Sequence, residues 1–367
     1  MTDAPAKRHN RRGLYAPFIL VVVVLTAWSV WWLYLTRQID SRLETQAQTL
    51  RQSGWDVRYA GKSITGWPFR TRLGLTQLEL KAPSGHALDF PVLNAEANAY
   101  QPTKWVLVAP EGLMLTRAGK GQVAVKGDAI RMSASGIGQT WPDLALEMVN
   151  PVFTTQTQAE PFPIARAARV EVYVRPHLEA AATPADASGD AIDVLFRLVD
   201  GQGRADGPVE GFAQDGKLTT QLEATLDKAG LLKRGGDAAG VFAAWARAGG
   251  AFRAVRGDLQ AGESRATLSS PVLGADGNGR LAGVLTLQAQ KPLPALAGLT
   301  ASRQGAVNRI GAAGAVAAAG AAQIAGQAAG QTASQTTEQA QTPLTLVFRD
   351  GRTWLGPFPL APAPKLF

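Results

Sequence analysis

The feature that most restricts the fold of this chain is a long apolar stretch near its N-terminus. Residues 14–35 read LYAPFILVVVVLTAWSVWWLYL and carry no charged side chain. A helix rises about 1.5 Å per residue, so this stretch is long enough to cross the roughly 30 Å hydrocarbon core of a bilayer. Because a soluble helix rarely needs every face to be apolar, the stretch predicts a transmembrane helix rather than a buried core helix.

The flanks of this stretch predict its orientation. Aromatic residues, which favour membrane interfaces, lie at both ends: Tyr15 at one, and Trp28, Trp31, Trp32 and Tyr34 at the other. The preceding tail, residues 1–13, is basic through Lys7, Arg8, Arg11 and Arg12, whereas both signs of charge follow residue 35. The positive-inside rule therefore predicts a single-pass protein with its N-terminus in the cytoplasm and the bulk of the chain beyond the membrane.

A cleaved signal peptide is the competing interpretation of residues 14–35. Its apolar region would be shorter, at about 7–15 residues, and a small-x-small cleavage site would follow. Here the run is longer, ends in bulky aromatic residues and has no clear Ala-x-Ala after it. We therefore favour an uncleaved signal anchor. Residues 36–53 then predict an amphipathic stalk helix, because Ile39, Leu43, Ala47 and Leu50 form one apolar stripe and Gly54 follows as a C-cap.

Between residues 54 and 300 the apolar pattern changes to alternation. Val170, Val172 and Val174 form one such run, and others begin at Leu218 and Leu281, with Gly-, Pro-, Asp- and Asn-rich turns between them. Alternation of period two predicts strands with one buried face. Many short strands joined by such turns predict a mainly β fold, a long antiparallel meander or curved sheet with a few packed helices.

One helix is predicted inside this β-rich region and another after it. The first covers residues 237–249, with Asp237 as its N-cap and Phe242 and Trp245 on its packed face. Residues 301–342 are rich in Ala, Gly and Gln, which predicts a surface helix fading into a flexible linker. A second membrane span is disfavoured because Leu, Ile and Phe are nearly absent there. Residues 343–367 predict a final strand and a Pro-rich tail.

Residues with catalytic or metal-binding chemistry form no recognisable set. The chain has no Cys, which excludes disulfides, thiolate nucleophiles and Cys-type zinc sites, and its three His residues are far apart. No nucleophile elbow, phosphate-binding loop or zinc-protease motif occurs. We therefore predict no catalytic, metal or cofactor site. The net charge is +8, but the folded region lacks a cluster of basic and aromatic residues, so we predict no nucleic-acid partner.

The stretch GWPFRTRL, residues 66–73, has two interpretations. Gly66 tolerates unusual backbone angles and Pro68 fixes its own φ, so the stretch predicts a corner at which a strand begins. The alternative is an aromatic binding site. If the sheet carries an apolar groove, the candidate residues for its lining or its end are Trp67, Phe69, Leu73, Leu75, Trp105, Phe242 and Trp245.

Four features in order resemble one bacterial family. They are the anchor with its stalk, the GWPFR corner at residues 66–70, the AWARAGG helix end at residues 244–250, and the DGRTWLGP stretch at residues 350–357. Together they are similar to the mainly alphaproteobacterial proteins catalogued as domain of unknown function 2125. The architecture is also similar to the AsmA-like envelope proteins, whose long curved sheet is associated with lipid movement or outer-membrane assembly.

The resemblance implies an inner-membrane-anchored, periplasmic protein. We expect it to be non-enzymatic and to bind phospholipid or another apolar envelope component on its sheet, in envelope maintenance or lipid transport. The alternative is a structural scaffold with envelope protein partners and no lipid groove. An envelope hydrolase is a minor alternative, because carboxylates far apart in a sequence converge in some folds. An open apolar groove would favour the first hypothesis, and a sealed core would count against it.

Overall fold

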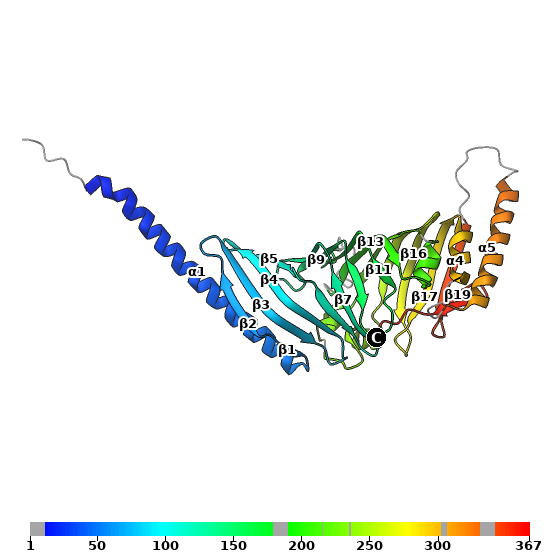
Figure 1. Cartoon of the computed structure of the whole chain (residues 1–367), viewed down its shortest axis with the longest axis horizontal. Helices are drawn as coiled ribbons and strands as arrows, with labels where there is room; N and C mark the ends of the chain where they lie inside the picture. Colours follow the sequence, from blue (N-terminus) through cyan, green and yellow to red (C-terminus); the bar gives the residue numbers. More distant parts are fainter. Residues whose placement is uncertain (1–11, 179–189, 215, 235, 302–306, 331–341) are drawn as a thin grey trace, which may run out of the picture.

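The protein is an elongated β-sheet with a long helix at one end and packed helices at the other (Figure 1). The computed structural model describes residues 12–178, 190–214, 216–234, 236–301, 307–330 and 342–367. Lys7, Arg8 and Arg11 therefore lie outside the described residues, and Arg12 begins the first helix. The prediction of a mainly β, antiparallel fold preceded by one apolar helix is confirmed.

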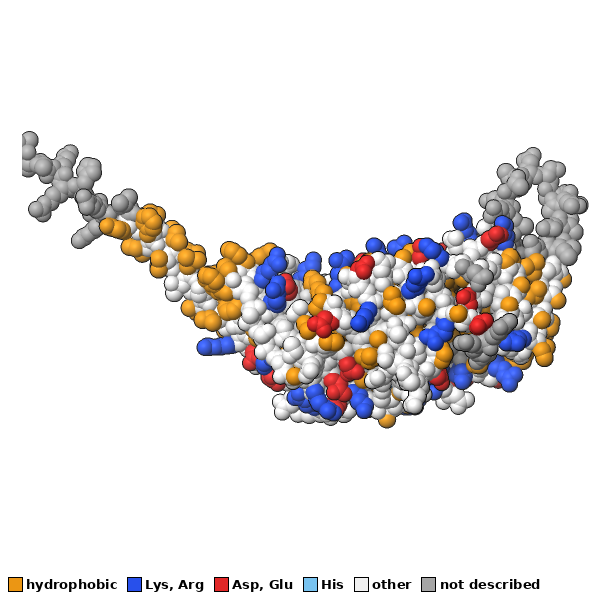
Figure 2. Space-filling model, viewed as in Figure 1, with side chains coloured by type: hydrophobic (Ala, Val, Ile, Leu, Met, Phe, Trp, Pro, Cys, Tyr) orange, Lys and Arg blue, Asp and Glu red, His pale blue; other side chains and the backbone are white. Residues whose placement is uncertain are grey.

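Helix α1 (Arg12–Gln52) joins the predicted anchor and the predicted stalk without a break. Most of its first half is exposed, and hydrophobic side chains run along it in Figure 2. Its second half packs on the sheet through the predicted stripe: Ala47 is buried, Ile39 and Leu43 are half-buried, and only Leu50 is exposed. In the part of the chain that the structure describes, α1 is the one helix long and apolar enough to cross a membrane.

In the described part of the chain, twenty strands form a single sheet in which each described pairing is antiparallel. In chain order the strands are β1 (Asp56–Arg58), β2 (Gly61–Thr65), β3 (Arg70–Lys81), β4 (Ala87–Asn98), β5 (Gln101–Val108), β6 (Leu113–Arg117), β7 (Gly121–Lys126), β8 (Ala129–Ser135), β9 (Asp143–Val149), β10 (Val152–Thr155), β11 (Ile164–Arg166), β12 (Arg169–Pro176), β13 (Ile192–Gly203), β14 (Leu218–Leu226), β15 (Phe252–Ala261), β16 (Ser264–Ala275), β17 (Leu281–Gln290), β18 (Thr342–Arg349), β19 (Arg352–Leu355) and β20 (Phe358–Pro362).

Several of these strands are the two halves of one longer, bent strand. Strands β5 and β6 both pair along β4, and β7 with β8, β9 with β10, and β11 with β12 continue the same ladders. The interruptions fall side by side, as the hydrogen bonds Asp128 N–H to Val149 O (3.0 Å) and Asn150 N–H to Ala168 O (2.9 Å) show. They form a crease across the sheet. Irregularities of this kind bend a strand and increase its twist, so the crease curls the sheet toward its apolar face.

Within the residues that the structure describes, five helical segments accompany the sheet besides α1, and α3 and α5 fall in the segments predicted to be helical. Helices α2 (Pro208–Ala213) and α4 (Pro292–Ala301) pack together with α5 (Arg309–Gly330), and η1 (Ala229–Arg234) packs with α3 (Val241–Arg247). Helix α3 begins later than predicted, with Gly240 as its N-cap. The Asp237 carboxylate instead accepts the Ala239 N–H and pairs with Arg247 at the helix end.

Helix α5 lies in the predicted Ala- and Gly-rich region, and one of its faces is packed while the other is exposed. Ala312, Ala315 and Ala319 are buried, and the helix packs on β18 and β20. Gly311 faces Pro359 and Gly314 faces the Phe358 ring so closely that a side chain at either position would overlap them. Small residues therefore serve here to bring a helix close to a strand. Residues 331–341, predicted as a linker, lie outside the described residues.

The contact between α2 and α4 should be sensitive to a single methyl group. A Cβ at Gly298 would overlap the Gly211 carbonyl group, whereas a Cβ at Gly320 of α5 would meet only Leu293, at 3.8 Å. We expect Gly298→Ala to destabilise the protein by about 1–3 kcal/mol. Gly320→Ala should stabilise it by up to about 1 kcal/mol, because Ala favours helix over Gly. Urea unfolding of the full chain in detergent measures both, and a Gly298→Ala protein as stable as the parent would contradict the close packing.

Candidate functional site

One continuous lane of side chains crosses the sheet from α1 toward α5. Following the paired residues from strand to strand gives Leu73, Ala95, Leu107, Met132, Leu146, Val172, Phe196, Leu222, Gly257, Leu268, Leu287 and Leu344. Each residue lies directly opposite the next, so all of them share one face. Adjacent strands are about 4.8 Å apart, so the lane is about 50 Å long, and apart from Gly257 every member is apolar.

The middle of this lane lies in an open cavity. Met132, Leu146 and Phe196 are only half-buried, although their side chains are apolar and lie on the face toward which the sheet curls. The cavity has a volume of about 590 Å³, within the usual range of roughly 300–1,000 Å³ for small-molecule sites. All of its lining residues except Arg131 are apolar. The strand halves on the other side of the crease also line the cavity, with Leu113 and Leu115 of β6 and Phe153 of β10. We call this cavity with its lane the groove.

A second apolar cavity lies farther along the same face. It is smaller, at about 180 Å³, and sits between the sheet and helices α2 and α4. Leu259 and Leu287 line it from the sheet, and Phe212 and Leu296 from the helices. Leu287 belongs both to the lane and to this cavity, so the apolar surface is continuous between the two.

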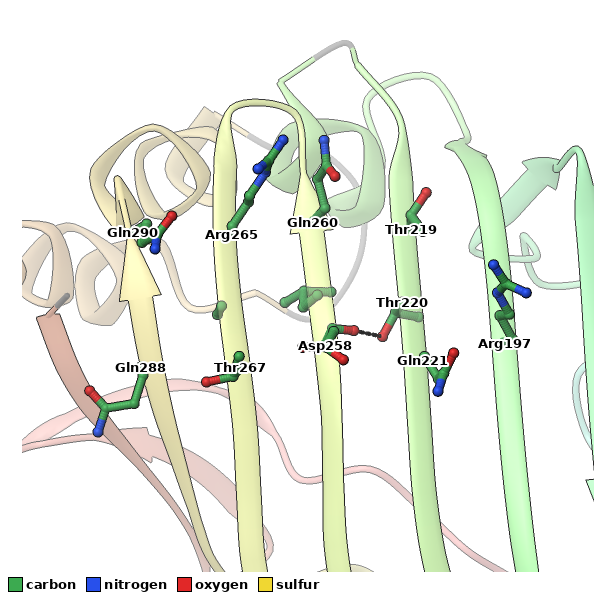
Figure 3. Close-up of a pocket in the computed structure, with 12 residues that line it drawn as sticks. Arg197, Thr219, Thr220, Gln221, Asp258, Gln260, Arg265, Thr267, Gln288 and Gln290 are labelled. Atoms are coloured by element: carbon green, nitrogen blue, oxygen red, sulfur yellow. Dashed lines mark hydrogen bonds between the residues drawn. The ribbon is translucent and has the colours of Figure 1, made fainter. Parts of the chain in front are cut away.

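The opposite face of the sheet is polar. Arg131 pairs with Glu147 at 2.5 Å, and the buried Glu171 carboxylate lies between Arg169 (3.4 Å) and Arg197 (3.5 Å). Figure 3 shows polar side chains of β13–β17 standing in rows on neighbouring strands, around a shallow hollow of about 530 Å³. Exposed ion pairs of this kind stabilise a fold only slightly. Because charged and polar side chains cover this face, it is hydrated. The groove lies on the other face, which is apolar.

The structure brings together only part of the predicted groove residues. Leu73 and Leu75 are buried and Trp105 packs against them, in one cluster at the α1 end of the lane. Trp67 and Phe69 instead project beyond the start of β3 and are 54% and 67% exposed. The backbone at Gly66 has φ +106°, as expected of a corner glycine, and the Trp67–Pro68 peptide bond is cis.

Phe242 and Trp245 lie apart from these residues, in a closed cluster at the ends of strands β13, β14 and β15. Trp245 is fully buried, its indole N–H donates to the Asp227 carbonyl oxygen at 2.7 Å, and Phe252 covers its ring at 5.1 Å between centroids. This pair therefore covers the ends of these strands and does not line the open cavity. Sequence reasoning missed the residues in the middle of the groove, such as Met132 and Leu146, because alternation identifies strands but not which strands lie opposite each other.

A charged cluster fixes the second half of α1 against β2. Lys62 Nζ lies 2.5 Å from the Asp40 carboxylate and 2.7 Å from that of Glu44, which also accepts the Tyr59 hydroxyl at 2.5 Å. Hydrogen bonds to Asp40 and Glu44 raise the pKa of Lys62, and those from Lys62 and Tyr59 lower the pKa of Glu44. Lys62 and Glu44 therefore keep their charges at neutral pH, and the cluster holds the sheet in one orientation along the helix.

A close pair of His and Asp lies on the polar face. His177 Nδ1 is 2.6 Å from Asp193, which also accepts the Thr225 hydroxyl at 2.9 Å. Burial acts to raise the pKa of Asp193, but the hydrogen bonds from His177 and Thr225 outweigh it and the pKa is lowered. The cluster joins β12, β13 and β14 outside the groove. Among the residues that the structure describes, no three His, Asp or Glu side chains converge as metal ligands.

Comparison with known proteins identifies one family. The family model described as "Uncharacterized protein conserved in bacteria (DUF2125)" matches residues 32–364, which confirms the resemblance stated from the sequence. The matched region contains the whole sheet and the helices α2 to α5. No curated protein and no solved structure matches the chain.

Proposed function

Because this chain belongs to an uncharacterized bacterial family, DUF2125, we propose its function from the groove: it is a membrane-anchored, non-enzymatic protein that holds the hydrocarbon chain of an envelope lipid. The observation that carries the proposal is the open apolar cavity, continuous with a lane across twelve strands. In this proposal α1 spans the inner membrane and the sheet lies in the periplasm. The likeness to AsmA-like proteins stays a prediction.

The physical argument starts from the exposure of apolar side chains. Apolar surface in water is unfavourable by about 25 cal/mol per Å², so half-exposed residues such as Met132 and Phe196 favour an apolar ligand. The lining side chains other than that of Arg131, which pairs with Glu147 on the polar face, are apolar, and such a lining suits a ligand that is pure hydrocarbon over its enclosed part. A lipid meets this requirement, because its polar headgroup can stay at the rim in contact with water.

Position-specific photo-crosslinking tests this proposal. A benzophenone amino acid is placed at Met132, which faces the groove, or at the adjacent Ser133, which faces the polar side, in the full chain in its native membrane. We expect lipid adducts at position 132 and none at 133. Protein adducts at 132 would instead support the scaffold hypothesis, and the absence of lipid at both positions would overturn the proposal.

A further inference from the structure

Three indole groups of α1 hold two turns of the sheet against the helix. The N–H of Trp28 donates to the Pro68 carbonyl oxygen at 2.7 Å, and that of Trp32 donates to Arg70 O at 2.9 Å. Both acceptors belong to the corner between β2 and β3. The N–H of Trp31 donates to Ala99 O at 3.3 Å, in the hairpin between β4 and β5. These two turns therefore lie beside residues 28–32 of the helix.

The position of these contacts along α1 sets the depth of the turns. The apolar run continues to Leu35, three to seven residues past the contacts, which is about 5–10 Å along the helix axis. With residues 14–35 across the bilayer, side chains beside residues 28–32 lie near the interface of the leaflet from which α1 emerges rather than in bulk water. Tyr and Trp favour this level, because their rings are apolar and their polar atoms reach water.

The two turns present aromatic side chains of the kind that this level favours. Trp67, Phe69 and Tyr100 are 54%, 67% and 69% exposed, and they flank the carbonyl groups that α1 holds. Basic side chains lie next to them: Arg70 is 66% exposed and Arg72 is 53% exposed, and both approach Glu96, at 3.6 and 2.5 Å. Long basic side chains can extend from such a site to lipid headgroups.

We propose that Trp67, Phe69 and Tyr100 form a second membrane contact, inserted into the interface of the leaflet from which α1 emerges. The contact rests on the proposed membrane anchor and deepens the proposed function. It places the α1 end of the lane, at Leu73 and Trp105, at the level of the lipid headgroups. A lipid then reaches the groove from the side of the leaflet, without crossing water.

Depth-dependent fluorescence quenching of the full chain in lipid nanodiscs tests this contact. The chain has no Cys, so Phe69→Cys and Tyr100→Cys each create one labelling site for an NBD fluorophore. Ser84→Cys is the matched control, because it lies in the turn at the other end of β3 and β4. That turn is near Lys81, which pairs with Asp56 past the end of α1, about 25 Å beyond Leu35. Leu25→Cys, in the apolar run, reports the anchor itself.

Lipids that carry a nitroxide near the headgroup should quench labels 69 and 100 at least about twofold, and label 84 hardly at all. Equal, weak quenching at 69, 100 and 84 would overturn the second contact. A label at 25 that a nitroxide near the end of the lipid acyl chain leaves unquenched would instead overturn the anchor and the contact with it. Because quenching is independent of any lipid in the groove, failure of lipid crosslinking at Met132 would leave the membrane contact standing. All four substitutions are at exposed or half-exposed residues, so folding should be retained.

Discussion

A Met132→Asp protein should carry at least about tenfold less bound lipid than the parent, because a carboxylate in the groove displaces hydrocarbon. Losing contact with about two methylene groups, at about 0.8 kcal/mol each, is already sufficient for a factor of ten. The carboxylate also needs water where the ligand would exclude it. Lipid extraction followed by mass spectrometry, normalised to protein from the same membranes, measures the effect.

Ser133→Asp is the control for the Met132 substitution. It adds the same charge to the same strand, one residue away and on the polar face. Because Met132 is half-exposed, its carboxylate keeps some hydration and the protein should remain folded, which circular dichroism verifies. Lipid lost equally from both variants, or retained by both, would show that the groove is not where lipid binds.

A Trp245→Ala protein should lose about 3–5 kcal/mol of its free energy of unfolding, the largest effect on stability that we expect from one side chain. Trp245 is fully buried and packs against Phe242 and Phe252. Its removal opens a cavity and leaves the Asp227 carbonyl oxygen without the indole donor. Denaturant unfolding of the full chain in detergent, followed by circular dichroism, measures the loss.

Two further substitutions serve as comparisons for Trp245→Ala: one removes the hydrogen-bond donor, and the other removes an exposed aromatic side chain. Trp245→Phe keeps an aromatic ring but removes the donor, so it should lose about 1–3 kcal/mol. Tyr173→Ala removes an aromatic side chain that is 41% exposed, and should change stability by less than about 1 kcal/mol. A Trp245→Ala protein as stable as Tyr173→Ala would contradict the closed cluster. Lipid binding should persist in any Trp245 variant that still folds, because the residue does not line the groove.

The sequence patterns predicted the elements of this fold better than their arrangement. The alternation at Val170, Val172 and Val174 became β12, and the apolar stripe of the stalk became the docking face of α1. Alternation depends on neighbours in the chain, so it is visible without a structure. The groove depends on register, and the irregularities at residues 109–112, 127–128 and 150–151 shift the register by amounts that no local pattern encodes.

The candidate site shows the same division between local pattern and spatial arrangement. Leu73, Leu75 and Trp105 meet because β3 and β5 both pair with β4, but Trp67 and Phe69 lie past the strand end and remain exposed. Phe242 and Trp245 are aromatic residues of a kind that occurs both in ligand sites and in hydrophobic cores. Only the packing of α3 shows that they belong to a core. Likewise, the sequence of α5 does not show that Gly311 and Gly314 closely approach β20. This contact is visible only in the structure.

Because the sheet is a meander, its span can change during evolution by the gain or loss of hairpins. Each long strand is hydrogen-bonded to the strands that precede and follow it in the chain, from β3 through β20. A sheet of this kind behaves as a one-dimensional array, in which inserting or deleting a hairpin disturbs only the adjoining pair. One hairpin adds about 10 Å to the span, and it lengthens the apolar track by two positions. The length of the sheet can thus change by two strands at a time, while both of its ends stay unchanged.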